Sequence, residues 1–65
     1  MATTTELVYA FVRQYIEEHS HAPSFREIGR ACYLSESTVR YHLKKLRDQG
    51  RITYDPGKGR TISLR

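Results

Sequence analysis

The stretch LSESTVRYHLKKL, Leu34 to Leu46, decides the fold of this 65-residue chain. Its apolar residues recur at the spacing of one helical face and therefore predict a buried stripe: Val39, Leu43 and Leu46. We expect a helix over about residues 35–49. Gly50 follows it, and glycine readily adopts the left-handed conformation that ends many helices.

The opposite face of this helix is small and polar at its start, then cationic and aromatic. These residues are Ser35, Ser37, Thr38, Arg40, Tyr41 and Lys44. Small hydroxyl side chains let a helix start approach a partner closely while they form hydrogen bonds to it. A merely solvated face is the alternative, and only the surrounding sequence separates the two interpretations.

A first helix is predicted before this stretch. Thr3 and Glu6 have the spacing of a capping box, which opens a helix. The apolar residues that follow at helical spacing are Leu7, Val8, Phe11, Val12, Tyr15 and Ile16. We expect this helix to end near Ser20. The segment His21–Pro23 cannot continue it, because proline restricts its own φ and the preceding residue, so a very short strand is expected there.

A second, shorter helix is predicted from another capping box, Ser24 and Glu27. Its apolar side consists of Phe25, Ile28, Ala31 and Cys32. Gly29 within it costs about 1 kcal/mol relative to alanine, which predicts the close approach of a neighbouring helix. Tyr33 begins the connection to the next helix. It adopts either a strained left-handed conformation or a different turn, and the short connection favours the different turn.

After Gly50 the apolar residues alternate as in half-buried strands: Ile52, Tyr54, Ile62 and Leu64. The segment DPGKG joins these strands. Pro56 suits the first central position of a turn, and Gly57 suits the second with a positive φ. We therefore predict an α+β fold, with three helices and a C-terminal two-stranded hairpin, as one domain over residues 1–65.

The distribution of charge points to a polyanionic partner. Residues 1–39 carry three basic and five acidic side chains, a net charge of −2, whereas residues 40–65 carry eight basic and two acidic ones, a net charge of +6. A solvated basic surface is the competing interpretation.

Composition excludes several classes of protein. The single cysteine, Cys32, excludes an internal disulfide framework, and together with His19 and His21 it lacks the spacing of a zinc site. No apolar run has the length of a membrane span and no signal peptide is recognisable, so a cytoplasmic protein is expected. No nucleophile, base and orienting group occur together, so we predict neither an enzyme nor a cofactor.

The two middle helices and their short connection are typical of a helix-turn-helix unit. The second helix of such a unit lies in the major groove of DNA, with its first residues at the base edges. Arg40 suits a bidentate contact to guanine, and Tyr41 a phosphate or a thymine methyl group. Lys58 and Arg60 at the hairpin tip suit the phosphate backbone or the minor groove. A protein-docking module remains the alternative.

Motifs along nearly the whole chain resemble the N-terminal winged-helix domain of the LexA family of bacterial repressors. They are PSFREIG at Pro23–Gly29, STV at Ser37–Val39, HL at His42–Leu43, LRDQGRI at Leu46–Ile52 and DPGK at Asp55–Lys58. The resemblance implies a winged helix-turn-helix fold and binding as a dimer to a palindromic operator. It places the base-reading positions at Ser35, Ser37, Thr38, Arg40 and Tyr41, and a phosphate contact at Ser24 to Arg26.

The sequence departs from the family in three respects. The turn between its two middle helices is one residue shorter than is typical of the family, so the same approach of the third helix is not assumed. Arg40 and Tyr41 are not residues associated with its reading positions, so the family's operator is not assumed. The chain contains neither an Ala-Gly scissile pair nor room for the family's serine–lysine protease, where most of its dimer contacts lie. We therefore expect a sequence-specific DNA-binding regulator of bacterial or phage type that acts as a repressor. It is expected to be a monomer alone and to bind DNA in one or two copies. A fragment of a longer autocleaving repressor is the other interpretation.

Overall fold

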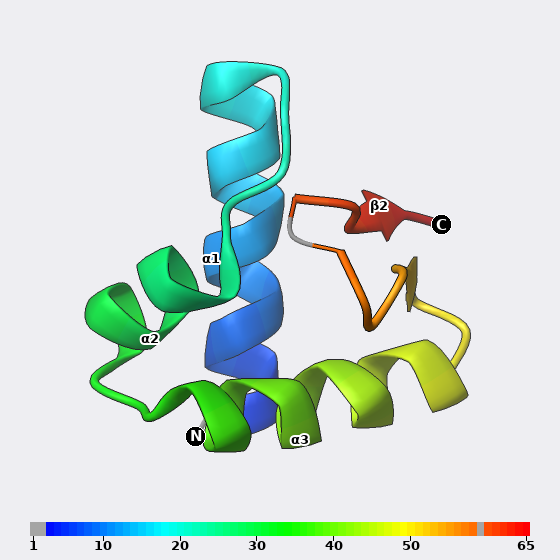
Figure 1. The fold of residues 1–65 in the computed structure, drawn as a ribbon. Helices are drawn as coiled ribbons and strands as arrows, with labels where there is room; N and C mark the ends of the chain where they lie inside the picture. The colour runs from blue at the N-terminus through cyan, green and yellow to red at the C-terminus, as the bar shows by residue number, and fades with distance from the viewer. Residues whose placement is uncertain (1–2, 59) are drawn as a thin grey trace.

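The computed structural model describes residues 3–58 and 60–65 as three helices followed by a two-stranded antiparallel sheet. The elements are α1 (Thr4–His19), α2 (Phe25–Cys32), α3 (Glu36–Asp48), β1 (Ile52–Thr53) and β2 (Ser63–Leu64). In Figure 1, α3 runs across one end of α1, with α2 and the hairpin on opposite sides of α1. The predicted α+β winged helix-turn-helix architecture is confirmed.

Each helix begins at a hydroxyl residue that accepts a hydrogen bond from a backbone N–H of the first turn. Thr3, Ser24 and Ser35 are these N-caps. At α2 the capping box is complete, because the Ser24 N–H also donates to Glu27 Oε1 at 2.8 Å. At α1 only the Thr3 hydroxyl bond forms, and the Glu6 carboxylate pairs with Arg51 instead.

The core lies where the three helices and the hairpin meet. Its buried apolar residues are Val8, Val12, Ala22, Phe25, Ile28, Val39, Leu43, Leu46, Ile52 and Ile62. The stripe predicted for α3 is confirmed, because all three of its residues are fully buried. Burial of this stripe is what turns its other face towards solvent.

The predicted apolar face of α1 is too wide. Val8 and Val12 are fully buried, whereas Phe11, Tyr15 and Ile16 are half-buried and the Leu7 side chain is 54% exposed. A helix that crosses its neighbour contacts it mainly along residues spaced by four, and flanking positions lie at the rim. Ala31 on α2 is likewise exposed, although the sequence placed it on the apolar side.

A polar contact joins α1 to α3 inside this framework. The Thr5 hydroxyl lies 2.8 Å from His42 Nδ1, and Thr5 is the one polar residue that is buried among those described. Burial lowers the pKa of His42, and the nearby Lys45 ammonium lowers it further. The neutral imidazole is therefore the form that pairs with Thr5 near neutral pH.

Gly50 ends α3 as predicted. Its φ is +74°, and its N–H donates to Arg47 O at 2.9 Å, while the Arg51 N–H donates to Leu46 O at 3.0 Å. This is the hydrogen-bond pattern of a Schellman motif, which reverses the chain and directs it into β1.

The short strand expected at His21–Pro23 does not form in the described part of the chain, so that prediction is wrong. Ala22 and Pro23 are instead buried against the core in irregular backbone. Pro23 has no N–H to donate to a neighbouring strand, and Ala22 O accepts from the Arg60 side chain at 3.2 Å. The Arg60 side chain therefore takes the hydrogen bond that a neighbouring strand would have supplied.

The hairpin pairs Ile52 with Leu64 and Thr53 with Ser63, so the strands are shorter than the alternating pattern indicated. The predicted positive φ of Gly57 is wrong, because its φ is not positive. Among the described residues of the hairpin, Arg60 is the one with a positive φ, +56°. The Lys58 N–H donates to Asp55 O at 3.1 Å and the Gly57 N–H to Asp55 Oδ1 at 2.9 Å. Such an Asp-capped turn with Pro56 at its first central position needs no positive φ. Gly59, also part of the predicted turn segment, lies outside the described residues.

Tyr33 adopts the left-handed conformation, with φ +58° and ψ +46°, so the different turn favoured by the short connection is wrong. The Leu34 N–H donates to Gly29 O at 2.8 Å, and this bond requires the chain to reverse at Tyr33. The tyrosine side chain is 94% exposed, so it recovers little packing energy for the strain.

Replacing Tyr33 with glycine is expected to stabilise the domain. A left-handed non-glycine residue costs about 1–2 kcal/mol, and the added chain entropy of glycine offsets about 0.5–1 kcal/mol of the gain. We expect Tyr33→Gly to raise the free energy of unfolding by about 0.5–1 kcal/mol in urea denaturation. Tyr33→Ala keeps the strain and is expected to change little. An equal or lower stability for Tyr33→Gly contradicts the assignment of strain to this residue.

Candidate nucleic-acid interface

The exposed face of α3 begins with a cluster of hydroxyl groups. Ser35 Oγ lies 3.2 Å from Ser37 Oγ and 2.9 Å from Thr38 Oγ1, and it also accepts from the Thr38 N–H at 3.3 Å. Ser35 and Ser37 are exposed and Thr38 is half-buried. Each hydroxyl group both donates and accepts, so the cluster can redirect its protons towards a partner without a change in the helix.

The next turns of α3 present the cationic and aromatic side chains predicted from the sequence. Ser37, Arg40, Tyr41 and Lys44 are spaced by three or four residues, so they share one face. Together with Phe25, Arg47, Tyr54 and Pro56 they line a groove between α3 and the hairpin. Tyr41 is 58% exposed, and Lys45 Nζ lies 5.5 Å from the centre of its ring.

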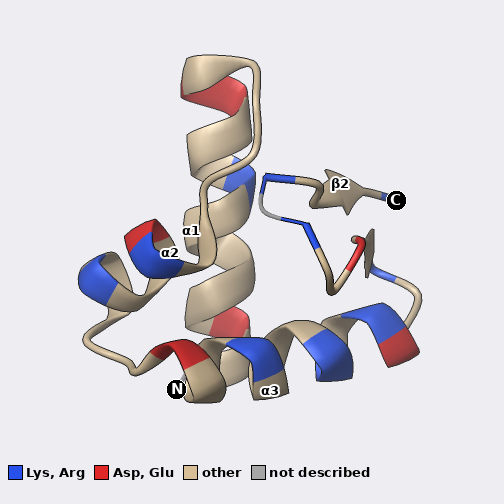
Figure 2. Cartoon of the chain, in the orientation of Figure 1, with Lys and Arg blue, Asp and Glu red and all other residues tan. Residues whose placement is uncertain are grey.

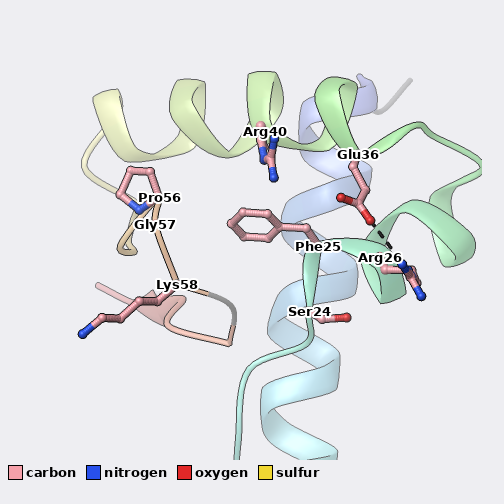
Figure 3. A pocket seen from close by; sticks show the side chains of 8 residues that line it. All are labelled: Ser24, Phe25, Arg26, Glu36, Arg40, Pro56, Gly57 and Lys58. Carbon is pink, nitrogen blue, oxygen red and sulfur yellow. Dashed lines mark ion pairs between the residues drawn. The ribbon is translucent and has the colours of Figure 1, made fainter.

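A second hollow joins three elements: the start of α2, the first turns of α3 and the hairpin turn (Figure 3). Its lining residues are Ser24, Phe25, Arg26, Glu36, Arg40, Pro56, Gly57 and Lys58. The Arg40 guanidinium lies over the Phe25 ring, 5.7 Å from its centre. In Figure 3 the ammonium group of Lys58 points away from the hollow. The hollow therefore brings together four sequence-predicted site residues, Ser24, Arg26, Arg40 and Lys58.

Sequence reasoning missed Glu36 and Phe25. The Glu36 carboxylate lies 3.7 Å from Arg26 Nε, with both side chains largely exposed, so solvent screens the attraction. Glu36 precedes Arg40 by four residues, and this spacing places it on the same exposed face of α3. The sequence assigned Phe25 to the core, and the structure confirms that it is buried. The Phe25 ring also lies against the Arg40 guanidinium. Only the fold reveals that second role.

Arg60 is not a simple cation at the hairpin tip. Its Nη2 lies 2.9 Å from Glu27 Oε1, and its Nη1 donates to Ala22 O. The nearby Tyr15 hydroxyl and the charge of Glu27 raise the pKa of Arg60. Its predicted phosphate contact remains a prediction, but the guanidinium already has partners within the domain.

Other basic residues of the range 40–65 also contact side chains within the domain. Arg51 pairs with Glu6, and its guanidinium lies 4.0 Å from the centre of the Tyr9 ring. Arg47 lies over Tyr54 at 5.0 Å. Part of the positive charge in residues 40–65 therefore holds the hairpin to the helices. Lysine and arginine nevertheless recur along α3 and in the hairpin (Figure 2).

The described residues contain no group of three or more metal-ligating side chains. Among the same residues, no helix is both long enough and apolar enough to cross a membrane. The chemistry available on the α3 face is hydrogen bonding by hydroxyl and guanidinium groups, positive charge and an aromatic contact.

Comparison with known proteins agrees with this geometry. The model of the LexA DNA binding domain matches residues 3–61. The chain is 43% identical over 60 residues to a LexA repressor of Clostridium tetani, which covers 91% of the chain and 30% of that repressor. It is 41% identical over 58 residues to a LexA repressor of Staphylococcus aureus and 43% identical over 58 residues to one of Listeria welshimeri, covering 88% of the chain and 28% of each repressor.

The chain thus spans less than a third of the length of these curated relatives. The family model, by contrast, covers all three helices, β1 and the hairpin turn, and ends just before β2. The fold, the exposed α3 face and this match agree, and the chain belongs to the LexA DNA-binding domain family.

Proposed function

We propose that this domain binds double-stranded DNA sequence-specifically, with α3 in the major groove and the hairpin turn against the backbone or minor groove. One observation carries the proposal: complete burial of Val39, Leu43 and Leu46 turns the hydroxyl, cationic and aromatic residues of α3 to solvent on one continuous face. A recognition helix needs such a face at its N-terminal end.

Roles follow from the chemistry of each side chain. The base-reading residues are Ser35, Ser37, Thr38, Arg40 and Tyr41, and the backbone-positioning residues are Ser24, Arg26, Lys44, Lys58 and Arg60. The hollow beside Arg40 supports this division, because it adjoins both the exposed face of α3 and the start of α2.

We also propose that residues 1–65 act as one domain. The protein works in the bacterial cytoplasm as a transcriptional repressor or as the DNA-binding part of one.

Selection of binding sites from a random duplex pool, followed by footprinting of the selected duplex, tests this function. We expect one short sequence to be enriched, and its footprint to show protected major-groove positions flanked by backbone contacts. A pool that remains random after selection, with binding no stronger than to arbitrary DNA, contradicts sequence-specific recognition.

A protein-docking role is the second candidate, and the exposed apolar side chains Leu7 and Tyr33 favour it. They line a hollow with Ala10, Phe11 and Leu34, on α1 and the turn after α2. The salt dependence of binding separates the two functions. Binding to DNA releases counterions and weakens steeply as salt rises, whereas docking through an apolar surface does not.

The contribution of the hairpin turn is expected to be sequence-independent. Lys58 is exposed at this turn and lines the hollow beside Arg40. We expect Lys58→Ala to weaken binding to all duplexes by a similar factor and to flatten the slope of log affinity against log salt by about one unit. Fluorescence anisotropy over a series of salt concentrations measures both effects. Arg13→Ala on α1 is the matched control, and an unchanged slope for Lys58→Ala removes this turn from the interface.

We expect the 65-residue chain to be a monomer at micromolar concentration without DNA. A domain of this size leaves little apolar surface after its core is filled, and only Leu7, Tyr33 and Tyr41 are large exposed apolar residues in the described ranges 3–58 and 60–65. Sedimentation equilibrium checks this, and a stable dimer contradicts it.

On a palindromic site two copies are expected, with half-sites about one helical turn apart if the copies touch. Fusion to an artificial dimerisation domain should then raise affinity for the palindrome by raising the effective concentration of the second copy. The same fusion should leave affinity for an isolated half-site nearly unchanged.

A further inference from the structure

An ion pair joins the hairpin to the start of α2, in addition to the contact between the Tyr54 and Phe25 rings, whose centres lie 6.0 Å apart. Glu27 Oε1 lies 2.9 Å from Arg60 Nη2, which comes from the segment that leads into β2. The other guanidinium nitrogen, Nη1, donates to Ala22 O at 3.2 Å. Arg60 therefore contacts both the carboxylate in the first turn of α2 and the chain segment just before that helix.

Glu27 is in turn held by two further donors. The Ser24 N–H donates to its Oε1 at 2.8 Å, and the Tyr15 hydroxyl of α1 donates to its Oε2 at 3.1 Å. These contacts, chiefly the backbone hydrogen bond from Ser24, hold the pKa of Glu27 at about 2. The carboxylate is therefore charged at neutral pH, with its position set by α1 and α2 rather than by the hairpin.

The sheet of the hairpin is very short. Each strand contributes only two residues to the sheet, and a two-stranded hairpin is marginally stable in water without support. Ile52 and Ile62 anchor its base in the core, but Pro56, Gly57 and Lys58 are all exposed. Thr61 Oγ1 accepts from the Asp55 N–H at 2.8 Å and closes the turn, so contacts between this closed hairpin and the helices determine where the turn lies relative to α3.

We propose that Glu27 is a positioning residue for DNA binding. Through its ion pair with Arg60 it holds the hairpin turn at a fixed position relative to α3. This role rests on the proposed DNA-binding function and adds to it. Glu27 does not touch DNA in this role. Through this ion pair Arg60 also tethers the hairpin, so Lys58 and Arg40 meet the same duplex at a fixed spacing.

Substitution of Glu27 by glutamine separates this positioning role from a purely electrostatic one, because the two predict opposite changes in DNA affinity. Glutamine keeps an oxygen that accepts from the Ser24 N–H, so the cap of α2 is retained. The substitution removes one negative charge, so a neutral amide oxygen replaces the carboxylate that pairs with Arg60 and holds the guanidinium more weakly. If charge alone controlled binding, Glu27→Gln would bind DNA more tightly. If Glu27 positions the hairpin, it binds more weakly.

Glu17→Gln is the matched control. Glu17 also pairs with an arginine, Arg13, at 3.3 Å, but both side chains lie exposed on α1. The two variants have the same charge, so a difference between them reports position rather than net charge. Binding is measured by anisotropy with the duplex recovered by selection and with an arbitrary duplex of about two helical turns, roughly 20 base pairs.

We expect Glu27→Gln to bind the selected duplex about 3- to 10-fold more weakly than Glu17→Gln, the usual size of coupling within one hydrogen-bonded network. Lys58→Ala should also have a smaller effect in the Glu27→Gln background, because a more weakly held turn presents Lys58 less often to the backbone. Equal or tighter binding by Glu27→Gln, or an undiminished Lys58→Ala effect, overturns the positioning role.

Tyr15→Phe provides a milder variant in case Glu27→Gln is poorly folded. It removes only the hydroxyl that donates to Glu27, and we expect a smaller loss of affinity in the same direction, with helical circular dichroism equal to that of the parent. Unchanged affinity in Tyr15→Phe counts against the proposal. If the parent itself binds no duplex, the proposed function fails. If the parent binds and only the expected weakening is missing, the positioning role alone fails.

Discussion

Replacing Gly29 with alanine is expected to destabilise the domain by about 1–3 kcal/mol, although alanine is the better helix former by about 1 kcal/mol. A Cβ at residue 29 would lie 2.6 Å from the carbonyl oxygen of Leu34, which is backbone and cannot rotate away. The Leu34 N–H also donates to Gly29 O, and this hydrogen bond holds the turn close to residue 29. The clash must therefore push the start of α3 away from α2.

Urea denaturation followed by circular dichroism measures the effect, and Arg30→Ala is the control because Arg30 is exposed on the same helix. We expect the control to lie within about 0.5 kcal/mol of the parent. Gly29→Ala should also weaken DNA binding under conditions where it remains folded, since α2 and α3 both line the hollow beside Arg40. A Gly29→Ala variant as stable as the parent shows that the turn yields at little cost.

Loss of Arg40 or Tyr41 is expected to change which duplexes are preferred, by about 1–3 kcal/mol for each side chain that makes a good base contact. Both side chains are exposed on the α3 face opposite the buried stripe. Arg40→Ala removes a bidentate donor suited to guanine, so we expect discrimination to fall at one base-pair position while the other positions keep theirs. Tyr41→Ala should act at a different position of the same site.

Affinities for the selected duplex and its single-base variants, measured at one salt concentration, check this expectation. Arg13→Ala removes the same charge as Arg40→Ala from α1, where Arg13 pairs with Glu17. It should therefore weaken binding to all duplexes slightly and equally. If Arg40→Ala and Tyr41→Ala both keep the base preferences of the parent, α3 does not read bases through these residues.

The local features of the fold were predictable because they depend on neighbouring residues. The buried stripe of α3 follows from the spacing of Val39, Leu43 and Leu46, and the caps at Thr3, Ser24 and Ser35 need donors only three residues away. Gly50 ends α3 by the same local logic. Gly29 was correctly identified as a point of close approach, although the backbone of the turn makes that approach more closely than the neighbouring helix does.

The predictions that failed depended on contacts that local pattern does not contain. Leu7 fits the apolar period of α1, but its exposure depends on how far α2 and the turn after it extend over that helix. The segment before α2 suits a strand, but a strand requires a partner, and the Arg60 side chain occupies Ala22 O instead. Tyr33 is left-handed because the bond from the Leu34 N–H to Gly29 O requires that reversal.

By itself the sequence determined the helices, their order, the exposed residues of α3 and the excess of positive charge in the second half. Only the tertiary structure decided which cations face solvent and which hold the fold together. Arg51 pairs with Glu6 across 45 residues, and Arg60 pairs with Glu27 of α2. The reason is physical: hydrogen bonds within a helix link residues a few positions apart, whereas these ion pairs form only after packing has brought distant elements within a few ångströms.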